Sequence, residues 1–387
     1  MNWKQKFSHF FAGFLFSWVL VLVIVIPQQE EERAQGEQKD QQGQKDQKDE
    51  KEVNAPTPSI KFHLKGLVGA EKLAFFNDPA VIAALAQHGF AVHAHDIGPR
   101  DAASHDLHGY DFAFPAGTPS AEVLQARSRT QGSYQPFFSQ LAIVSWRELL
   151  PALERAKVVE KQPDGDWYRI DMARLLSMSE SGQLWNDLPG KPRFQQAKPV
   201  RISLGDLRSS NASQMYLALA AHVVDHDPYL GNNPPKKSTL SILSPHVPSH
   251  DGQGTAVPSS IAQFKSLGMD QVQLMAIDES EFLAYQTRRK ESDPEIVLLY
   301  PAPSLVNQHV LLPFNDLARH LGELLSTDPQ LQKLAVAHGY RNAAPELFTA
   351  LRTKHKLAAP LSVVNRIDPA RHATLENMIR SIDSTPR

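Results

Sequence analysis

The chain has 387 residues, with 40 lysines and arginines against 42 acidic residues, and it contains no cysteine. The lack of cysteine excludes disulfide bonds, thiolate catalysis and a lipid anchor on cysteine. Beyond residue 58 the acidic and basic residues are equal in number, which argues against a broad electrostatic surface for nucleic acid. That part of the chain is long enough for two lobes of ordinary domain size.

The first element is an apolar run from Phe7 to Ile26 that carries no formal charge. Its length matches the roughly 20 residues of helix that cross a bilayer core. Lys4 and Lys6 precede the run and glutamates follow it, so we expect the rest of the chain outside the cytoplasm. The run is longer than a signal-peptide core and ends in Val-Ile-Val-Ile-Pro without a small-residue cleavage site. These features favour an uncleaved transmembrane anchor over residues 1–27.

The next segment, residues 28–58, is a predicted linker. It contains QGEQKDQQGQKDQKDEKE, in which no residue is apolar, followed by Ala-Pro-Thr-Pro. Such a composition cannot bury a core and is typical of a disordered chain. As a coil, it would hold the folded part roughly 30 Å from the membrane.

After the linker, the hydrophobic pattern alternates between strand and helix periodicity. The expected elements, in chain order, are a strand over 60–69, a helix over 71–88, strands over 90–95, 110–117 and 136–146, helices over 147–156 and 171–187, a strand over 198–206, a helix over 210–224, an irregular segment over 225–254, a helix over 257–267, a strand over 271–277, a helix over 280–288, two extended runs within 295–314, helices near 315–326 and 328–338, and a helical tail to Ile382. This alternation predicts an α/β fold with right-handed crossovers.

Several blocks of this pattern occur together in one known family. They are KGLVGAEKLAFFNDPAV, LAIVSWRELLPAL, VRISLGDLRSSNASQMYLAL, AIDESEFL and VLLYPAPSLVNQHVLLPF with LLSTDPQLQKLAVAHGYR after it. With these blocks the chain resembles bacterial extracellular solute-binding proteins of the type II periplasmic-binding fold, which are related to phosphate and molybdate binders. The last block is the most specific, because in that family a strand ending in Tyr-Pro returns the chain to the first lobe.

The resemblance implies two α/β lobes joined by crossing strands, with ligand held in the cleft between them. Lobe one is expected over 59–140 and 305–342, lobe two over 141–304, and a helical C-terminal tail over 343–387. General rules agree, because ligands in open α/β sheets lie beyond the carboxyl ends of strands and clefts between domains are favoured sites.

The predicted ligand contacts lie mostly on turns that join strands to helices. They are Gly69, Ala70, Glu71, Thr118, Ser145, Arg208, Ser209, Ser210, Asn211 and Glu279. We expect the main anchor at Arg208–Asn211, where a helix N-terminus offers free N–H groups to an anion and Arg208 adds charge. Ser209 and Asn211 are good N-caps, so an ordinary capped helix is the alternative reading.

The other predicted contacts follow strands of lobe one and lobe two. The family often places a hydroxyl where Ala70 stands, so only the backbone N–H groups of Gly69–Glu71 offer a contact there, and a tight glycine turn is the alternative. Thr118 is a plausible donor or simply an N-cap before Pro119. Related sequences tend to show Tyr-Glu where this chain has Asp278 and Glu279, so Glu279 matches. The alternatives for this pair of carboxylates are general acid–base catalysis, binding of a cation and, as the simplest reading, capping of the following helix.

Histidines cluster in three places, namely around His93 and His95, around His222 and His226, and around His246 and His250. Imidazole and carboxylate suit zinc, but no spacing here matches a known ligand set, so no metal and no other cofactor is predicted. Signatures of serine hydrolases, P-loop enzymes and dinucleotide-binding enzymes are absent from the sequence. A hydrolase is therefore the least favoured class.

The sequence thus predicts a single-pass protein of the bacterial inner membrane whose periplasmic part binds a small polar or anionic solute. Hinge closure over the solute is the expected mechanism, and an ABC-type importer is the expected partner. The alternative is a scaffold or sensor that has lost its solute and engages an envelope protein. The departures at Ala70 and Asp278 favour that alternative somewhat.

Overall fold

The computed structural model describes residues 59–130, 132–190, 194, 197–226, 236–247, 260–363 and 365–384. The predicted anchor and linker lie outside these residues and stay predictions. Within the described part of the chain, no helix is both long and apolar enough to cross a membrane.

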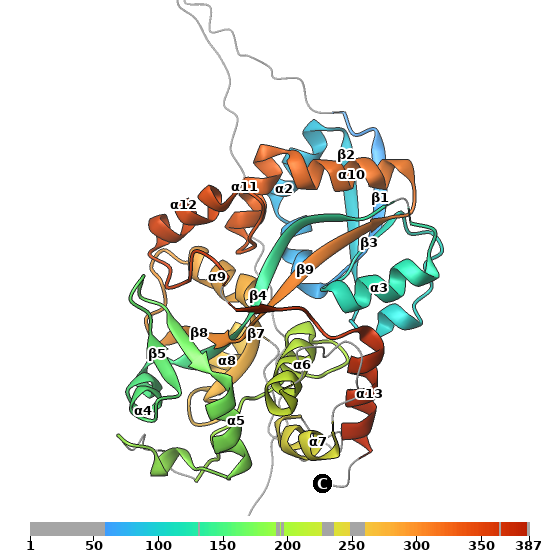
Figure 1. Ribbon diagram of the computed structural model, residues 1–387. Helices are drawn as coiled ribbons and strands as arrows, with labels where there is room; N and C mark the ends of the chain where they lie inside the picture. Colours follow the sequence, from blue (N-terminus) through green and yellow to red (C-terminus); the bar gives the residue numbers. More distant parts are fainter. Residues whose placement is uncertain are drawn as a thin grey trace, which may run out of the picture. The chain divides into compact units, whose positions relative to one another are not determined.

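Strands and helices are interspersed along the described chain (Figure 1). The strands are β1 (Phe62–Val68), β2 (Phe90–Asp96), β3 (Phe112–Phe114), β4 (Tyr134–Trp146), β5 (Val159–Lys161), β6 (Tyr168–Asp171), β7 (Leu274–Asp278), β8 (Ile296–Ala302), β9 (Ser304–Pro313) and β10 (Arg366–Ile367). The α-helices are α1 (Leu73–Phe76), α2 (Pro79–Gln87), α3 (Thr118–Arg127), α4 (Leu150–Arg155), α5 (Met172–Glu180), α6 (Asn211–Asp225), α7 (Lys237–Leu243), α8 (Ile261–Leu267), α9 (Glu279–Thr287), α10 (Asp316–Thr327), α11 (Pro329–Ala337), α12 (Pro345–His355) and α13 (His372–Asp383).

The strands form one continuous path in the order β2-β1-β3-β9-β4-β8-β6-β5, with β7 paired to β4 and β10 paired to β9. β1, β2 and β3 are parallel, whereas β9 runs antiparallel to β3 and β4. The long strand β4 pairs with β9 over residues 134–140 and with β7 and β8 over residues 141–146. The first sheet half consists of β2, β1, β3, β9 and residues 134–140 of β4. The second sheet half consists of residues 141–146 of β4 with β7, β8, β6 and β5.

Each sheet half has its own buried apolar residues. In the first half, one face packs against α1, α2, α10 and α11, and the other face packs against α3. Buried Ala318, Leu321 and Leu325 follow helical spacing on α10, which explains why this late helix covers early strands (Figure 1). A separate and larger cluster joins the second half to α4, α5 and α6. The places where the lobes begin and end nevertheless stay predictions.

The expected helix over 71–88 is two helices in the structure. A short helical turn over Ala70–Lys72 leads into α1, which ends at Phe76, and α2 begins after Asp78, whose carboxylate accepts a hydrogen bond from Ala80 N at 2.8 Å. Pro79 lacks an N–H group and fits only the first turn of a helix, so the break falls at this point.

The second sheet half departs further from the sequence prediction. Residues 198–206 make only isolated bridges, Leu184 with Pro199 and Ser203 with Met275, instead of a full strand. The β5–β6 hairpin was not predicted, because each of its strands has at most four residues. α5 ends at Glu180, ahead of Gly182, which takes a left-handed φ of 67°.

The C-terminal segment packs against both sheet halves. Phe348 of α12 and the buried residues Leu375, Met378 and Ile379 of α13 join the apolar cluster of the second half. α13 also contacts α3, which covers the first half. Arg100 in the loop after β2 donates two hydrogen bonds to Glu376 of α13, at 2.8 and 2.9 Å. This segment therefore ties elements of the two halves together.

Candidate functional site

Four segments meet where β1 and β3 end. A Cβ atom added to Gly69 would lie 2.5 Å from the carboxylate oxygens of Glu71 and 2.8 Å from the backbone nitrogen of Ala116. One added to Gly117 would lie 2.4 Å from Asn307 Oδ1 and 3.2 Å from Asn211 Oδ1. These short distances show that the turns after β1 and β3 lie against β9 and against the start of α6.

We call this region the polar junction. It comprises Glu71, Lys72, Asn211, Asp278, Asn307 and His309. The two sheet halves both contribute to it, since Asp278 ends β7 and Asn211 begins α6, whereas the others belong to the first half. It lies at the carboxyl ends of parallel strands, where α/β proteins place their ligands.

An ion pair forms one side of the polar junction. The ammonium group of Lys72 is fully buried and donates to Glu71 Oε1 at 2.5 Å and to the Pro115 carbonyl at 2.9 Å. Burial lowers the pKa of Lys72, and the charge of Glu71 offsets part of that effect. Burial also opposes ionisation of Glu71, but the charge of Lys72 and the contact with His309 prevail and lower its pKa to about 2. Glu71 is therefore a carboxylate at any physiological pH.

His309 stands beside this ion pair. Its Nδ1 atom lies 3.6 Å from Glu71 Oε1, beyond hydrogen-bond distance, and its Nε2 atom lies 3.0 Å from the hydroxyl of Ser139. Burial, reinforced by the charge of Lys72, lowers the pKa of His309. The imidazole is thus neutral near pH 7 and adds no positive charge to the polar junction.

Asn307 and Asp278 form the other side. Asn307 Nδ2 donates to the Ala116 carbonyl at 2.6 Å and to Asp278 Oδ2 at 3.3 Å. Asp278 also caps α9 by accepting from the backbone and hydroxyl of Ser280. Burial raises the pKa of Glu281, one turn further on, to about 7, and the charges of Asp278 and Glu71 add to this shift. Negative charge therefore accumulates here.

Within the described residues, three buried side-chain atoms of the polar junction lack a hydrogen-bond partner. They are Asn211 Nδ2, Asn307 Oδ1 and His309 Nδ1. Asn307 is 2 % exposed and His309 is fully buried, so solvent does not readily reach them. Buried polar groups are normally paired, and a cluster of exceptions indicates a place for water or ligand.

The predicted anchor at Arg208–Asn211 lies partly at the polar junction. Arg208 and Ser209 are exposed on the turn, and Arg208 N donates to Asp206 Oδ1 at 2.9 Å. The N-cap of α6 is Ser210, whose hydroxyl oxygen accepts from Ser213 N at 3.2 Å, so neither Ser209 nor Asn211 holds that position. Asn211 is the member of this group that enters the polar junction.

Predicted contacts of the first sheet half fall at the same place. Gly69 is buried, Ala70 is exposed, and Glu71 belongs to the ion pair described above. Gly117 rather than Thr118 is the N-cap of α3, and Thr118 is the first helical residue. The structure thus brings Gly69, Glu71 and Asn211 together, and Thr118 directly follows Gly117, which approaches Asn211.

Ser145 and Glu279 lie elsewhere and have structural partners. Ser145 is fully buried in β4 and donates to the Gln273 carbonyl at 3.1 Å. Glu279 is also fully buried, and its carboxylate accepts from Arg341 Nη2 at 2.7 Å, from Arg341 Nε at 2.8 Å and from the Tyr300 hydroxyl at 2.7 Å. We call Glu279, Tyr300 and Arg341 the arginine cluster.

Sequence reasoning missed Asn307 and His309, although a signal was present. They occupy alternate positions in the apolar strand SLVNQHVLLP, so both side chains lie on the same face of β9. Polar residues are unusual in such a buried strand unless they are paired or functional. No comparable signal distinguishes Lys72 from an exposed lysine.

The predicted histidine clusters do not form a metal centre in the described residues, where no group of three or more His, Cys, Asp or Glu side chains could hold an ion. His93 and His95 lie on the edge strand β2. His246 is buried, with its Nε2 atom 2.9 Å from the Ser179 hydroxyl, and burial lowers its pKa to about 4. His250 lies outside the described residues.

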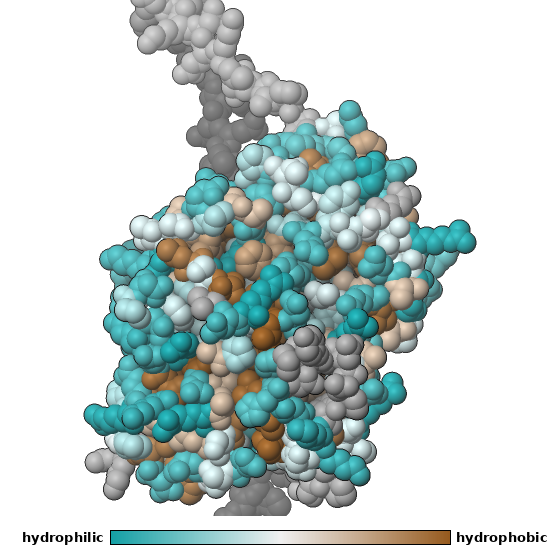
Figure 2. Space-filling view, viewed as in Figure 1, coloured by the Kyte–Doolittle hydropathy of each residue, from teal (hydrophilic) through white to brown (hydrophobic). Residues whose placement is uncertain are grey.

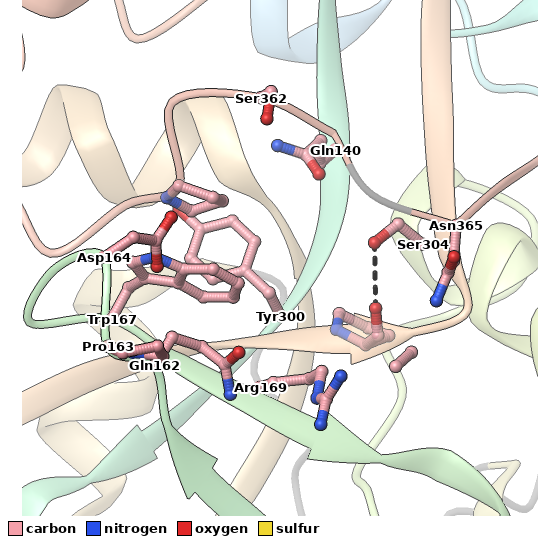
Figure 3. A pocket seen from close by; sticks show the side chains of 13 residues that line it. Gln140, Gln162, Pro163, Asp164, Trp167, Arg169, Tyr300, Ser304, Ser362 and Asn365 are labelled. Carbon is pink, nitrogen blue, oxygen red and sulfur yellow. Dashed lines mark hydrogen bonds between the residues drawn. The ribbon is translucent and has the colours of Figure 1, made fainter.

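A pocket of about 240 Å³ opens beside the arginine cluster (Figure 3). Its walls come from the β5–β6 hairpin, the β8–β9 connection and the segment after α12, and its lining residues are Gln140, Gln162, Pro163, Asp164, Trp167, Arg169, Tyr300, Pro301, Ala302, Ser304, Pro360, Ser362 and Asn365. Gln140 Nε2 is buried here without a hydrogen-bond partner among the described residues. None of the predicted ligand contacts lines this pocket.

The fold is that of periplasmic solute-binding proteins, which confirms the resemblance seen in the sequence. A periplasmic thiamin binding protein aligns with a TM-score of 0.53 at 12% identity, over 83% of this chain and 96% of its own. Iron-bound HitA from Pseudomonas aeruginosa aligns with a TM-score of 0.50 at 12% identity, over 83% and 97%. No protein-family model matches the sequence, and a search of curated proteins finds no relative. At such low identity the likeness establishes the fold alone.

Proposed function

We propose that this chain is an extracytoplasmic solute-binding protein that closes on a small polar or anionic solute at the polar junction. The observation that carries the proposal is the set of unpartnered buried atoms on β9 and α6, which come from the two sheet halves. A solute that pairs with these atoms only when the two halves are together binds the closed state more tightly than the open state. This difference in affinity stabilises the closed state.

The apolar run at Phe7–Ile26 would hold the protein at the bacterial inner membrane with its folded part in the periplasm. An ABC-type importer is the partner that this location and fold suggest. The start of α6, at Arg208–Asn211, serves as the anchor for the solute, because Asn211 carries a free buried donor at a helix N-terminus.

A thermal-shift screen of the full chain in detergent tests the proposal. Oxyanions, amino acids, sugars and amines are each added in large excess, and a ligand of the folded state raises the melting temperature by mass action. At least one class is expected to stabilise the protein. If no class does so, solute binding is ruled out as the function.

A scaffold that engages an envelope protein is the second candidate. The observation in its favour is α13, which packs against α3 and against α6 and α7, and would resist opening of the halves. Large exposed apolar side chains are nevertheless few in the described residues, and they lie on separate segments, namely Ile60 before β1, Ile82 on α2, Leu317 on α10 and Leu361 after α12. Figure 2 likewise shows apolar residues in small groups among hydrophilic ones. A silent screen together with a co-purifying envelope protein would favour the scaffold.

A further inference from the structure

The polar junction has two sides of opposite character. On one side are acceptors, namely Asn307 Oδ1 without a partner, the carboxylate of Glu71 and the carboxylate of Asp278. On the other side are donors, namely Asn211 Nδ2 without a partner and the N-terminus of α6 that begins at the same residue. A Cβ on Gly117 would lie 2.4 Å from Asn307 Oδ1 and 3.2 Å from Asn211 Oδ1, so the two asparagine side chains meet at this glycine.

The acceptor side favours a positively charged group. Lys72 neutralises part of its charge, but the ammonium group already bonds Glu71 Oε1 and the Pro115 carbonyl. His309 is neutral and adds no positive charge. A second carboxylate, Asp278, is bonded only to neutral donors, Ser280 and Asn307. An ammonium group would find both charge and hydrogen-bond acceptors there.

The donor side favours a carboxylate. Asn211 Nδ2 is a free N–H donor at the first position of α6, a helix of 15 residues. The partial positive charge at a helix N-terminus attracts anions, and a buried unpaired amide beside it supplies an additional donor. Arg208 is exposed on the turn that precedes α6.

We propose that the solute is a small zwitterion of the amino-acid type. Its ammonium group binds Asn307 Oδ1, Asp278 and Glu71, and its carboxylate binds Asn211 at the start of α6. This inference rests on the proposed function and narrows its solute class. An inorganic oxyanion would face the carboxylates of Asp278 and Glu71, and a simple amine would leave the donor of Asn211 unpaired.

The first experiment uses matched ligands on the full chain in detergent. The twenty common amino acids are screened by thermal shift, and the best is compared with its amide, with its deaminated acid, and with sulfate and phosphate. We expect the amino acid to bind at least tenfold more tightly than its amide or its deaminated acid. Equal binding of either derivative overturns the zwitterion, and stabilisation by sulfate or phosphate alone overturns it while leaving solute binding intact. Silence from every ligand of this set also overturns the zwitterion, whereas the proposed function falls only if the sugars and amines of the wider screen are silent as well.

The second experiment uses a matched pair of capping aspartates. Asp278 caps α9 and Asp171 caps α5, and asparagine caps a helix about as well as aspartate. Asp278→Asn and Asp171→Asn should therefore melt within a few degrees of the parent protein. We expect Asp278→Asn to lose tenfold or more in affinity for the amino acid and to lose its preference over the deaminated acid, whereas Asp171→Asn keeps both. Unchanged selectivity in Asp278→Asn excludes the assigned ammonium site.

Discussion

The arginine cluster and the polar junction are two buried polar groups with opposite bonding. Every nitrogen of the Arg341 guanidinium donates a hydrogen bond, to Glu279, to the Pro360 carbonyl or to the Leu361 carbonyl. The polar junction contains three buried atoms without partners. A saturated network holds segments together, whereas an unsaturated one retains bonding capacity for a ligand.

Breaking the arginine cluster should have the largest effect on stability. Arg341 joins β4 through paired backbone hydrogen bonds with Phe138 and joins α9 through Glu279. Arg341→Met leaves the carboxylate of Glu279 buried and unpaired, so the free energy of unfolding should fall by about 3–5 kcal/mol. Chemical denaturation measures the loss.

The matched control for this variant is Arg169→Met. Arg169 forms an ion pair with Glu160 in which both side chains are about half exposed. Such surface pairs contribute roughly 0–1 kcal/mol, so this variant should be nearly as stable as the parent protein. Equal losses in the two variants would mean that the arginine cluster is not structural.

Acid should weaken the polar junction through Glu71. Its pKa in the folded protein, about 2, lies below the ordinary value of 4.5, so its ionisation stabilises the fold above about pH 4.5. That contribution is lost as the pH falls from about 4.5 toward 2. We expect it to amount to about 2–3 kcal/mol, which denaturant titrations at pH 7 and pH 3 would measure. The difference in unfolding free energy between the parent protein and Glu71→Gln should therefore be smaller at pH 3 than at pH 7. The same difference at both pH values would contradict the lowered pKa of Glu71.

The fold could be predicted because its information is local. Alternating apolar patterns located most helices and strands, whereas the return of the chain after the Tyr-Pro strand was implied by the family resemblance. The predictions failed at short elements such as β5 and β6, whose few residues carry no clear periodicity. The break at Pro79 was readable from chemistry, since proline begins helices and does not continue them.

The candidate site could be predicted only in part, because its contacts are long-range. Turns after strands pointed to Gly69, Glu71 and Asn211, which do converge. Glu279 matched the family pattern, yet its partner Arg341 is 62 positions away in sequence. The residues around Glu279 in the sequence do not show that its carboxylate already has hydrogen-bond partners. Asn307 reaches the site only because β9 lies between β3 and β4, a pairing that periodicity does not specify.

Releasing α13 should expose the polar junction with only a modest loss of stability. The hydrogen bonds from Arg100 to Glu376 join the loop after β2 to a helix that packs against α6 and α7. Glu376→Gln should cost about 1 kcal/mol and increase hydrogen exchange at the start of α6 and in α13. Glu323→Gln, which removes an exposed ion pair on α10, is the control and should leave exchange in those segments unchanged. If the two variants exchange alike, α13 does not restrain the halves.

The smallest effect should come from Gln140, a residue with an unpartnered amide nitrogen outside the polar junction. Gln140 Nε2 is buried at the pocket in Figure 3, where the charged side chains of the lining, Asp164 and Arg169, already bond Trp167 and Glu160. Gln140→Leu removes an unpaired polar group and keeps its shape, so stability should change by less than about 1 kcal/mol or rise. Solute affinity should also stay unchanged in the thermal-shift titration, because an unpaired amide marks a ligand site only where complementary charge surrounds it. Loss of solute binding in Gln140→Leu would contradict the assignment of the solute to the polar junction, because the pocket would then hold the solute.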